Sequence, residues 1–96
     1  MKKTYNKDRS RCRVTFELPA EVEAETAAVC GDFNDWDREK HVLVKRKDGR
    51  FSTTLTLEPG KYHYRFWLDD SRWENDWNAE EYVPNEFGSE DSIVTI

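Results

Sequence analysis

Two tryptophans in turn-like segments are the residues of this chain best suited to chemistry at a surface. Trp36 lies in the polar segment 31–37, and Trp73 follows the acidic turn 69–71, where the alternation of apolar side chains has ended. An exposed indole can pack on the less polar C–H face of a sugar ring, and the apolar area removed from water contributes about 25 cal/mol per Å². One ring gives weak binding, whereas two indoles that face the same way hold successive sugar units. The two residues therefore favour a sugar as the ligand.

Arg65 lies between the two tryptophans in the sequence, on a segment where polar and apolar side chains alternate. Its guanidinium carries five N–H donors in a fixed plane, which suits two adjacent hydroxyl groups. Trp67 falls on the same side of this segment, and it either forms the base of the site or covers a neighbouring strand. Trp77 follows in an acidic stretch, and we expect it mainly to pack that stretch against the domain, with a secondary role in binding as the alternative.

Strands must position these side chains, because the dominant period of the apolar residues is two. Asp48-Gly49 is a hairpin signal, and Pro59-Gly60 marks a second turn. The strand that carries Arg65 is expected to turn its tyrosines, Phe66 and Leu68 to the core and its other residues to solvent. The segments predicted as strands are 13–18, 26–30, 42–47, 51–57, 61–69 and 92–96.

Six or seven short antiparallel strands with closely spaced turns are typical of an all-β, immunoglobulin-like sandwich. The chain has 96 residues, enough for one domain with a modest core. Residues 1–10 are predicted to be a flexible polar arm and residues 11–96 the domain. Residues 74–91 are predicted to be a long acidic excursion with little periodicity.

Composition restricts the classes of partner. Hydrophobic and charged residues each make up 36% of the chain, yet 14% is aromatic, which indicates a folded protein. The net charge of −5 and the pI near 5.0 argue against binding to nucleic acid, whose phosphates require basic side chains. No apolar run of about 18 residues is present, and no apolar segment follows the basic N-terminus, so we expect neither a membrane span nor export. The expectation is a cytoplasmic monomer.

The cysteines and the acidic residues predict no further chemistry. Cys12 and Cys30 fall on opposite sides of their strands, so both are predicted to be free thiols. Segment 32–43 begins like a calcium loop but lacks the glycine and the final glutamate of an EF-hand. The two histidines have no zinc spacing, and a small sandwich has little room for the cleft that glycoside hydrolysis requires. We therefore expect no catalytic residues, no metal and no cofactor.

Four segments together resemble a known family. They are Gly-Asp-Phe-Asn-Asp-Trp at 31–36, Tyr-Arg-Phe-Trp-Leu-Asp-Asp at 64–70, Trp73, and Val-Pro-Asn-Glu-Phe-Gly at 83–88. In this order and spacing they resemble the early-set glycogen-binding modules. These are the family-48 carbohydrate-binding modules of isoamylase, of branching enzymes and of the β subunit of AMP-activated protein kinase. The resemblance covers residues 12–96 and implies an early-set sandwich that binds α-1,4-linked glucan without catalysis.

The resemblance also implies which residues bind. The two tryptophans would stack on sugar, the arginine would take the place of the family's usual lysine, and a bulky apolar residue before Gly88 would abut the sugar chain. Three positions depart from the family pattern: this chain has Asp91 where the family has Asn, Asp70 where it has Gly, and Trp77 where it commonly has Pro. Because a carboxylate only accepts hydrogen bonds, Asp91 is expected to alter specificity or weaken affinity. The implied carbohydrate-binding set is Trp36, Arg65, Trp73, Phe87, Ser89 and Asp91.

Partners and an alternative function follow from the same resemblance. Such modules usually accompany a catalytic or regulatory domain, so a glycogen- or starch-metabolising enzyme is an expected partner in trans. The alternative is a protein-interaction domain that has kept the fold and lost sugar binding. Geometry separates the two, because sugar binding requires Trp36, Arg65 and Trp73 on one solvent-open face.

Overall fold

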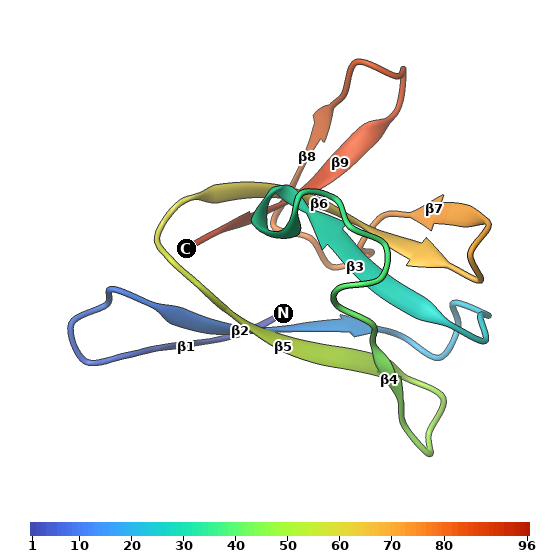
Figure 1. The fold of residues 1–96 in the computed structure, drawn as a ribbon, viewed down its shortest axis with the longest axis horizontal. Helices are drawn as coiled ribbons and strands as arrows, with labels where there is room; N and C mark the ends of the chain where they lie inside the picture. The colour runs from blue at the N-terminus through green and yellow to red at the C-terminus, as the bar shows by residue number, and fades with distance from the viewer.

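The computed structural model describes residues 1–96 and consists of short strands with a single 3-10 helix (Figure 1). Most strands end at a turn, and the turns contain glycine, proline or acidic residues, which interrupt the alternating pattern. The elements are β1 (Lys2–Tyr5), β2 (Cys12–Leu18), β3 (Ala27–Gly31), η1 (Asp32–Asn34), β4 (Val44–Lys45), β5 (Phe51–Leu57), β6 (Lys61–Leu68), β7 (Arg72–Glu74), β8 (Glu81–Pro84) and β9 (Glu90–Thr95).

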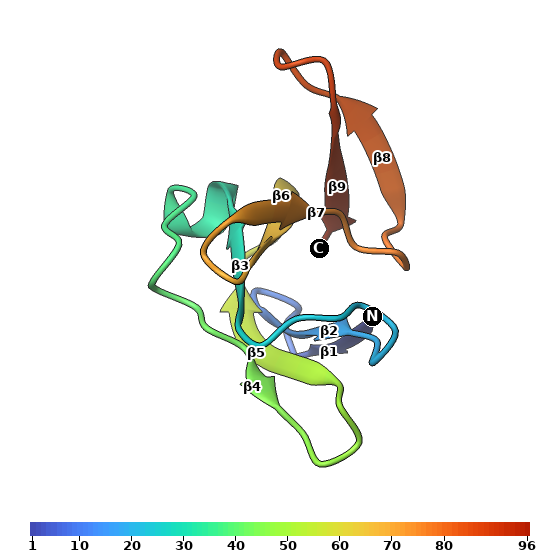
Figure 2. The same ribbon diagram turned by 90° about the vertical axis from the view of Figure 1, so that its right-hand side faces the viewer.

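The strands form two antiparallel sheets. One sheet has the order β1-β2-β5-β4, and the other has the order β3-β6-β9-β8 with β7 paired to β6. In Figure 2 the first sheet lies below the second, and the tip of the β8–β9 hairpin extends away from both. This arrangement confirms the predicted all-β sandwich.

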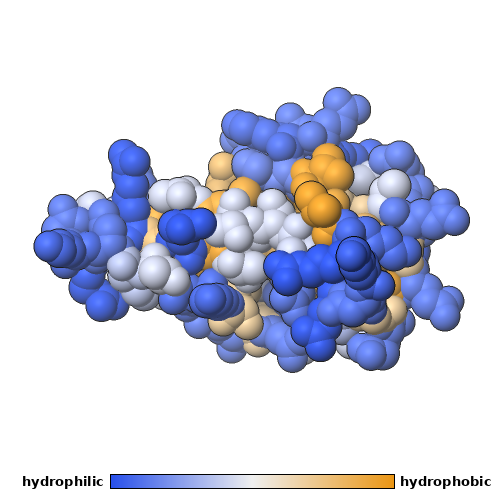
Figure 3. Space-filling model, turned by 90° about the horizontal axis from the view of Figure 1, so that it is seen from below, coloured by the Kyte–Doolittle hydropathy of each residue, from blue (hydrophilic) through white to orange (hydrophobic).

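The core lies between the sheets and follows the predicted alternation. On β2 the buried side chains are those at every second position from Cys12 to Leu18. The ring of Phe16 meets that of Tyr64 on β6, with 5.0 Å between the ring centroids. Seen from below in Figure 3, the surface is mainly hydrophilic, with apolar atoms confined to small areas. The buried faces of β2 and β6 therefore fix which side of β6 points outward.

The strand count is higher than predicted, with nine strands in place of six or seven. Residues 2–5, predicted as part of a flexible arm, form the edge strand β1, where Tyr5 pairs with Cys12 and packs against the core. The acidic excursion at 74–91 contains β8, together with the last residue of β7 and the first two residues of β9, and only Val44 and Lys45 of segment 42–47 form a strand. Short edge strands with one exposed face carry polar sequences, so periodicity alone did not reveal them.

Both cysteines are buried free thiols, as predicted. Cys30 pairs with Arg65 and so lies on the outer side of its sheet, the side the sequence indicated. It is nevertheless covered by the segment after η1, because its Sγ donates a hydrogen bond to the carbonyl of Asp37 at 3.3 Å. Burial raises the pKa of the Cys30 thiol to about 11. The thiol is therefore protonated and unreactive near neutral pH.

No helix in this structure has the length and hydropathy that a membrane span requires.

Candidate functional site

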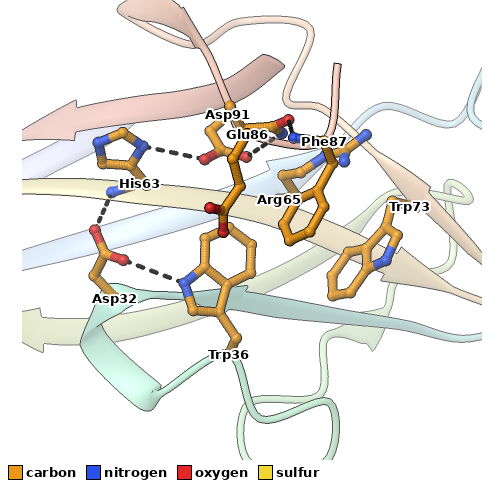
Figure 4. Close-up of a pocket in the computed structure, with 9 residues that line it drawn as sticks. Asp32, Trp36, His63, Arg65, Trp73, Glu86, Phe87 and Asp91 are labelled. Carbon is orange, nitrogen blue, oxygen red and sulfur yellow. Dashed lines mark hydrogen bonds and ion pairs between the residues drawn. The ribbon is translucent and has the colours of Figure 1, made fainter. Parts of the chain in front are cut away.

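A pocket lies on the outer face of β6 and β7, between the segment after η1 and the tip of the β8–β9 hairpin (Figure 4). Its volume is about 670 Å³, which is in the range of small-molecule sites. Most of the sequence-predicted site residues line it, and Ser89 does not. The lining residues are Asp32, Trp36, His63, Arg65, Trp73, Asn85, Glu86, Phe87 and Asp91.

The turn after η1 holds Trp36 at the pocket. Asp35 and Trp36 both adopt left-handed backbone conformations, with φ of 56° and 59°. The Trp36 N–H donates to the Gly31 carbonyl at 2.9 Å, and the indole N–H donates to Asp32 Oδ1 at 3.2 Å. Gly31 is required here, because a Cβ would lie 2.5 Å from the carbonyl oxygen of His63. The motif at 31–36 therefore sets both the turn and the position of the indole.

A tight hairpin places Trp73 beside the same pocket. Asp69 and Asp70 in its turn adopt left-handed conformations, with φ of 53° and 52°, so Asp70 holds the conformation that glycine favours. The Asp69 carboxylate accepts the N–H groups of Thr26 and Glu25, and these hydrogen bonds lower its pKa. The turn therefore fixes β7, and with it Trp73, against β6.

Trp67 supports Trp73 from behind and does not line the pocket. The two residues are cross-strand partners, and their ring centroids lie 4.7 Å apart. The guanidinium of Arg38 lies over the Trp67 ring, 4.2 Å from its centroid. With a tryptophan on one side and an arginine on the other, Trp67 covers the neighbouring strand β7 and takes no part in the pocket lining, which was the second of the two roles that the sequence left open.

Trp36 and Trp73 contact each other edge to face. Their ring centroids lie 6.0 Å apart and their planes meet at 76°. The expectation that the two indoles face the same way is therefore wrong, because an edge-to-face contact between neighbouring rings is favoured by their quadrupoles. Both side chains are half-buried, so the pocket has two inclined aromatic walls instead of one flat platform.

Arg65 carries hydrogen-bond donors that the protein does not use. Its Nε is buried and has no hydrogen-bond partner, and the guanidinium has no carboxylate within ion-pair distance. Its Cζ lies 6.0 Å from the centroid of the Trp73 ring. The buried Nε is closed off from solvent, whereas the terminal guanidinium nitrogens also make no hydrogen bond to the protein, so Arg65 can offer those donors to a ligand in the pocket.

Polar residues across the pocket from Trp73 form a chain of hydrogen bonds (Figure 4). The main-chain N–H of His63 donates to Asp32 Oδ2 at 2.8 Å, and its ring Nδ1 lies 3.1 Å from Asp91 Oδ2. The amide of Asn85 donates to Asp91 Oδ1 at 3.1 Å. Both oxygens of Asp91 therefore already have protein partners, although the residue lines the pocket as the sequence predicted.

Four lining residues escaped the sequence prediction: Asp32, His63, Asn85 and Glu86. The alternation on β6 placed His63 on the same side as Arg65, and that pattern was the available signal. Asn85 and Glu86 lie in the segment that carries Phe87, but nothing in a single sequence shows which side chains of a hairpin tip turn toward a neighbouring sheet.

The tip of the β8–β9 hairpin presents Phe87 to solvent. The side-chain oxygen of Asn85 accepts the N–H groups of Phe87 and Ser89, at 2.9 and 3.1 Å, which closes the turn. Gly88 has a φ of 77°, a conformation that glycine adopts readily. Phe87 is 84% exposed, the largest exposure among the large apolar residues. The tip therefore offers an unpacked apolar ring at the edge of the pocket.

The prediction that Trp77 packs the acidic stretch is wrong. Trp77 is 52% exposed and outside the pocket, with its indole N–H donating to Glu74. Asp76 holds this stretch instead: it is buried, its Oδ2 accepts the Tyr64 hydroxyl at 2.7 Å, and its N–H donates to Ser92. The Asp76 carboxylate accepts the hydrogen bond that the buried Tyr64 hydroxyl donates. An indole in its place would leave that hydroxyl without a partner.

No group of three or more His, Cys, Asp or Glu side chains is arranged to hold a metal ion. The pocket instead combines aromatic walls with unpaired donors and with carboxylate acceptors, a lining that suits a neutral ligand rich in hydroxyl groups.

The fold and the pocket define a small all-β domain with an aromatic site on the outer face of one sheet. Over residues 13–96 the chain matches the family model described as the glycogen recognition site of AMP-activated protein kinase. The match covers most of the chain, and the protein therefore belongs to this family. No curated protein matches the chain.

Proposed function

We propose that the pocket binds α-1,4-linked glucan, such as glycogen, starch or malto-oligosaccharides, without catalysing a reaction on it. The main support for the proposal is that one open pocket brings together two tryptophan walls and the unpaired donors of Arg65. Trp36, Arg65 and Trp73 meet there, which is the geometric condition that favours sugar over the alternative of a docking domain.

The angle between the walls supports an α-linked ligand. Successive glucose units in an α-1,4 chain are turned relative to one another, so the chain curves. Two indoles at 76° can each pack against a different unit of a curved chain, whereas a straight, flat chain would contact one of them. Phe87 at the hairpin tip would abut the next glucose unit, because its ring is exposed to solvent.

Polar groups would set the orientation of the sugar. The guanidinium of Arg65 would donate to adjacent hydroxyl groups. Glu86 is exposed and would accept from a hydroxyl, whereas Asp91 would use only the lone pairs that His63 and Asn85 leave free. Ser89 lies outside the pocket lining, and its N–H is bonded to Asn85, so it contributes mainly to the turn.

The proposed role is recognition alone, and it uses no metal or cofactor. Asp32 and Asp91, two of the carboxylates that line the pocket, hold protein N–H groups and are not a free pair across a sugar-sized cleft. A monomer of this kind would bring a glycogen- or starch-metabolising enzyme, in the same chain or in trans, to its polymer.

Titration with maltoheptaose or β-cyclodextrin tests the proposal, with tryptophan fluorescence and backbone amide shifts as readouts. We expect a Kd on the order of 10 μM to 1 mM, which corresponds to about −4 to −7 kcal/mol. Cellohexaose, a straight β-linked chain, is the matched control and should bind more weakly. Failure of both malto-oligomers to move any pocket resonance would overturn the proposal and favour the docking domain.

A further inference from the structure

The geometry points to His63 as a positioning residue that couples the two sides of the glucan site, an inference that rests on the proposed function. His63 would hold the turn of Trp36 and the tip of Phe87 at a fixed separation through Asp32, Asp91 and Asn85. We call this chain of residues, Asp32–His63–Asp91–Asn85, the His63 relay. The sequence prediction did not include His63 among the site residues.

On one side, the relay reaches Trp36 through a single carboxylate. Asp32 Oδ1 accepts the indole N–H of Trp36 at 3.2 Å, and Asp32 Oδ2 accepts the main-chain N–H of His63 at 2.8 Å. Because the two oxygens belong to one rigid group, the indole is fixed relative to the backbone of β6. This half of the relay uses the main chain of His63, so it survives any substitution of the side chain.

On the other side, the relay reaches the hairpin tip through the His63 ring. A carboxylate only accepts hydrogen bonds, so Nδ1 must donate to Asp91 Oδ2 across their 3.1 Å separation. Asp91 Oδ1 accepts from Asn85, and the amide oxygen of Asn85 closes the turn that carries Phe87. The hairpin tip is thus tied to β6 by the His63 ring.

Beyond the His63 ring, the tip is held by hydrogen bonds within the hairpin, such as that from the Asn85 N–H to the Ser89 carbonyl at 2.9 Å. Asn75, whose Nδ2 donates to the Glu90 carbonyl at 2.9 Å, holds the start of β9 from outside the hairpin. The tip extends from the sandwich in both ribbon views, and Phe87, Gly88 and Ser89 are all exposed (Figures 1 and 2). The charged groups that line the pocket with the His63 ring are Asp32 from η1, Arg65 from β6, Glu86 from the tip and Asp91 from β9. Among these groups, the His63 ring is hydrogen-bonded to Asp91 alone.

A side-chain series at position 63 tests the inference. In His63→Asn the amide nitrogen occupies nearly the place of Nδ1 and can still donate to Asp91, whereas His63→Ala and His63→Leu cannot donate. We expect the Kd for maltoheptaose to rise about fivefold in the Ala and Leu variants, which lose one positioning hydrogen bond, and to recover in the Asn variant. The Leu variant keeps the side-chain volume, so it decides the result if His63→Ala is unstable.

The ligand-free protein supplies the second readout. The amide resonances of Phe87 and Ser89 should shift and broaden in His63→Leu, return in His63→Asn, and stay unchanged in the control Lys61→Ala. Lys61 lies on the same strand and face but outside the pocket. These resonance shifts are measured without sugar. If the wild-type protein binds no glucan and the His63 variants still show the shifts, the proposed function is refuted while the relay is supported.

The opposite result would remove the relay. If the Leu and Asn variants weaken binding equally while the tip resonances stay in place, His63 merely contacts sugar. If no variant changes either readout, the ring has no part in the site.

Discussion

The indole of Trp73 is held between two tryptophans: it meets Trp36 edge to face at 6.0 Å and packs against Trp67 at 4.7 Å. The position of the Trp73 ring is therefore fixed by two neighbouring rings, one from the turn after η1 and one from β6. A side chain that is held in place before the ligand arrives loses little conformational entropy on binding, which favours recognition of a weakly bound ligand.

Removing either wall should weaken glucan binding without unfolding the domain. Trp36→Ala and Trp73→Ala are each expected to cost at least ~1 kcal/mol, about a fivefold rise in Kd, because each loses one apolar contact with sugar. Isothermal titration with maltoheptaose measures the change. Trp77→Ala is the matched control, since Trp77 is exposed and outside the pocket, and should leave the Kd unchanged. Unfolding of either wall variant would show that the indole belongs to the core.

Arg65→Lys should also weaken binding, although it keeps the charge. The guanidinium presents several donors in one plane, whereas the ammonium of lysine is a single point of charge that cannot span two adjacent hydroxyls in the same way. We expect a Kd increase of about threefold to tenfold. An unchanged Kd for maltoheptaose, measured by tryptophan fluorescence, would mean that the unpaired donors of Arg65 are not used by the ligand.

The acidic stretch should depend on the hydrogen bond between Tyr64 and Asp76 for its stability. Tyr64→Phe leaves the buried Asp76 carboxylate without its hydroxyl donor, so the free energy of unfolding should fall by about 1–3 kcal/mol in urea denaturation. Tyr62→Phe is the matched control: its hydroxyl bonds the Glu58 carbonyl at an exposed site and should matter less. Equal losses in the two variants would argue against a special role for Asp76.

Stability should fall as the solution becomes acidic through the titration of His41. Burial, reinforced by Lys40, lowers the pKa of His41 below its ordinary value of 6.5. Its Nδ1 accepts a hydrogen bond from Asn34, so the folded protein favours the neutral ring. The pKa of His41 is lower in the folded protein than in the unfolded chain. The stability that the neutral ring contributes is therefore fully present above about pH 6.5 and is lost as the pH falls below that value.

Denaturation midpoints measured from pH 7.5 to 5 check this expectation. In His41→Gln, which keeps an acceptor for Asn34 but does not titrate, the decline over this range should be smaller than in the unmodified protein. The exposed Asp69, whose pKa is also lowered, loses its contribution only at more acidic pH, below its ordinary value of 3.8. A decline that is the same in both proteins would assign it to other groups.

Much of the site followed from local sequence. The alternation along β6 determined that Arg65 faces outward, because the side chains of a strand alternate between faces and Tyr64, Phe66 and Leu68 must be buried. The turn sequence at 31–36 and the segment before Gly88 indicated that Trp36 and Phe87 are on loops. These properties depend on neighbours within a few residues, so the sequence contained them.

Only the tertiary structure decided how these side chains meet. The angle between Trp36 and Trp73 depends on where η1 and β7 lie on β6, and these elements are far apart in the chain. The bond from His63 to Asp91 depends on the register of β6 with β9. Asp76 replaced Trp77 as the anchor of the acidic stretch because a buried tyrosine hydroxyl needed an acceptor. Long-range pairing sets such contacts, and no local pattern encodes it.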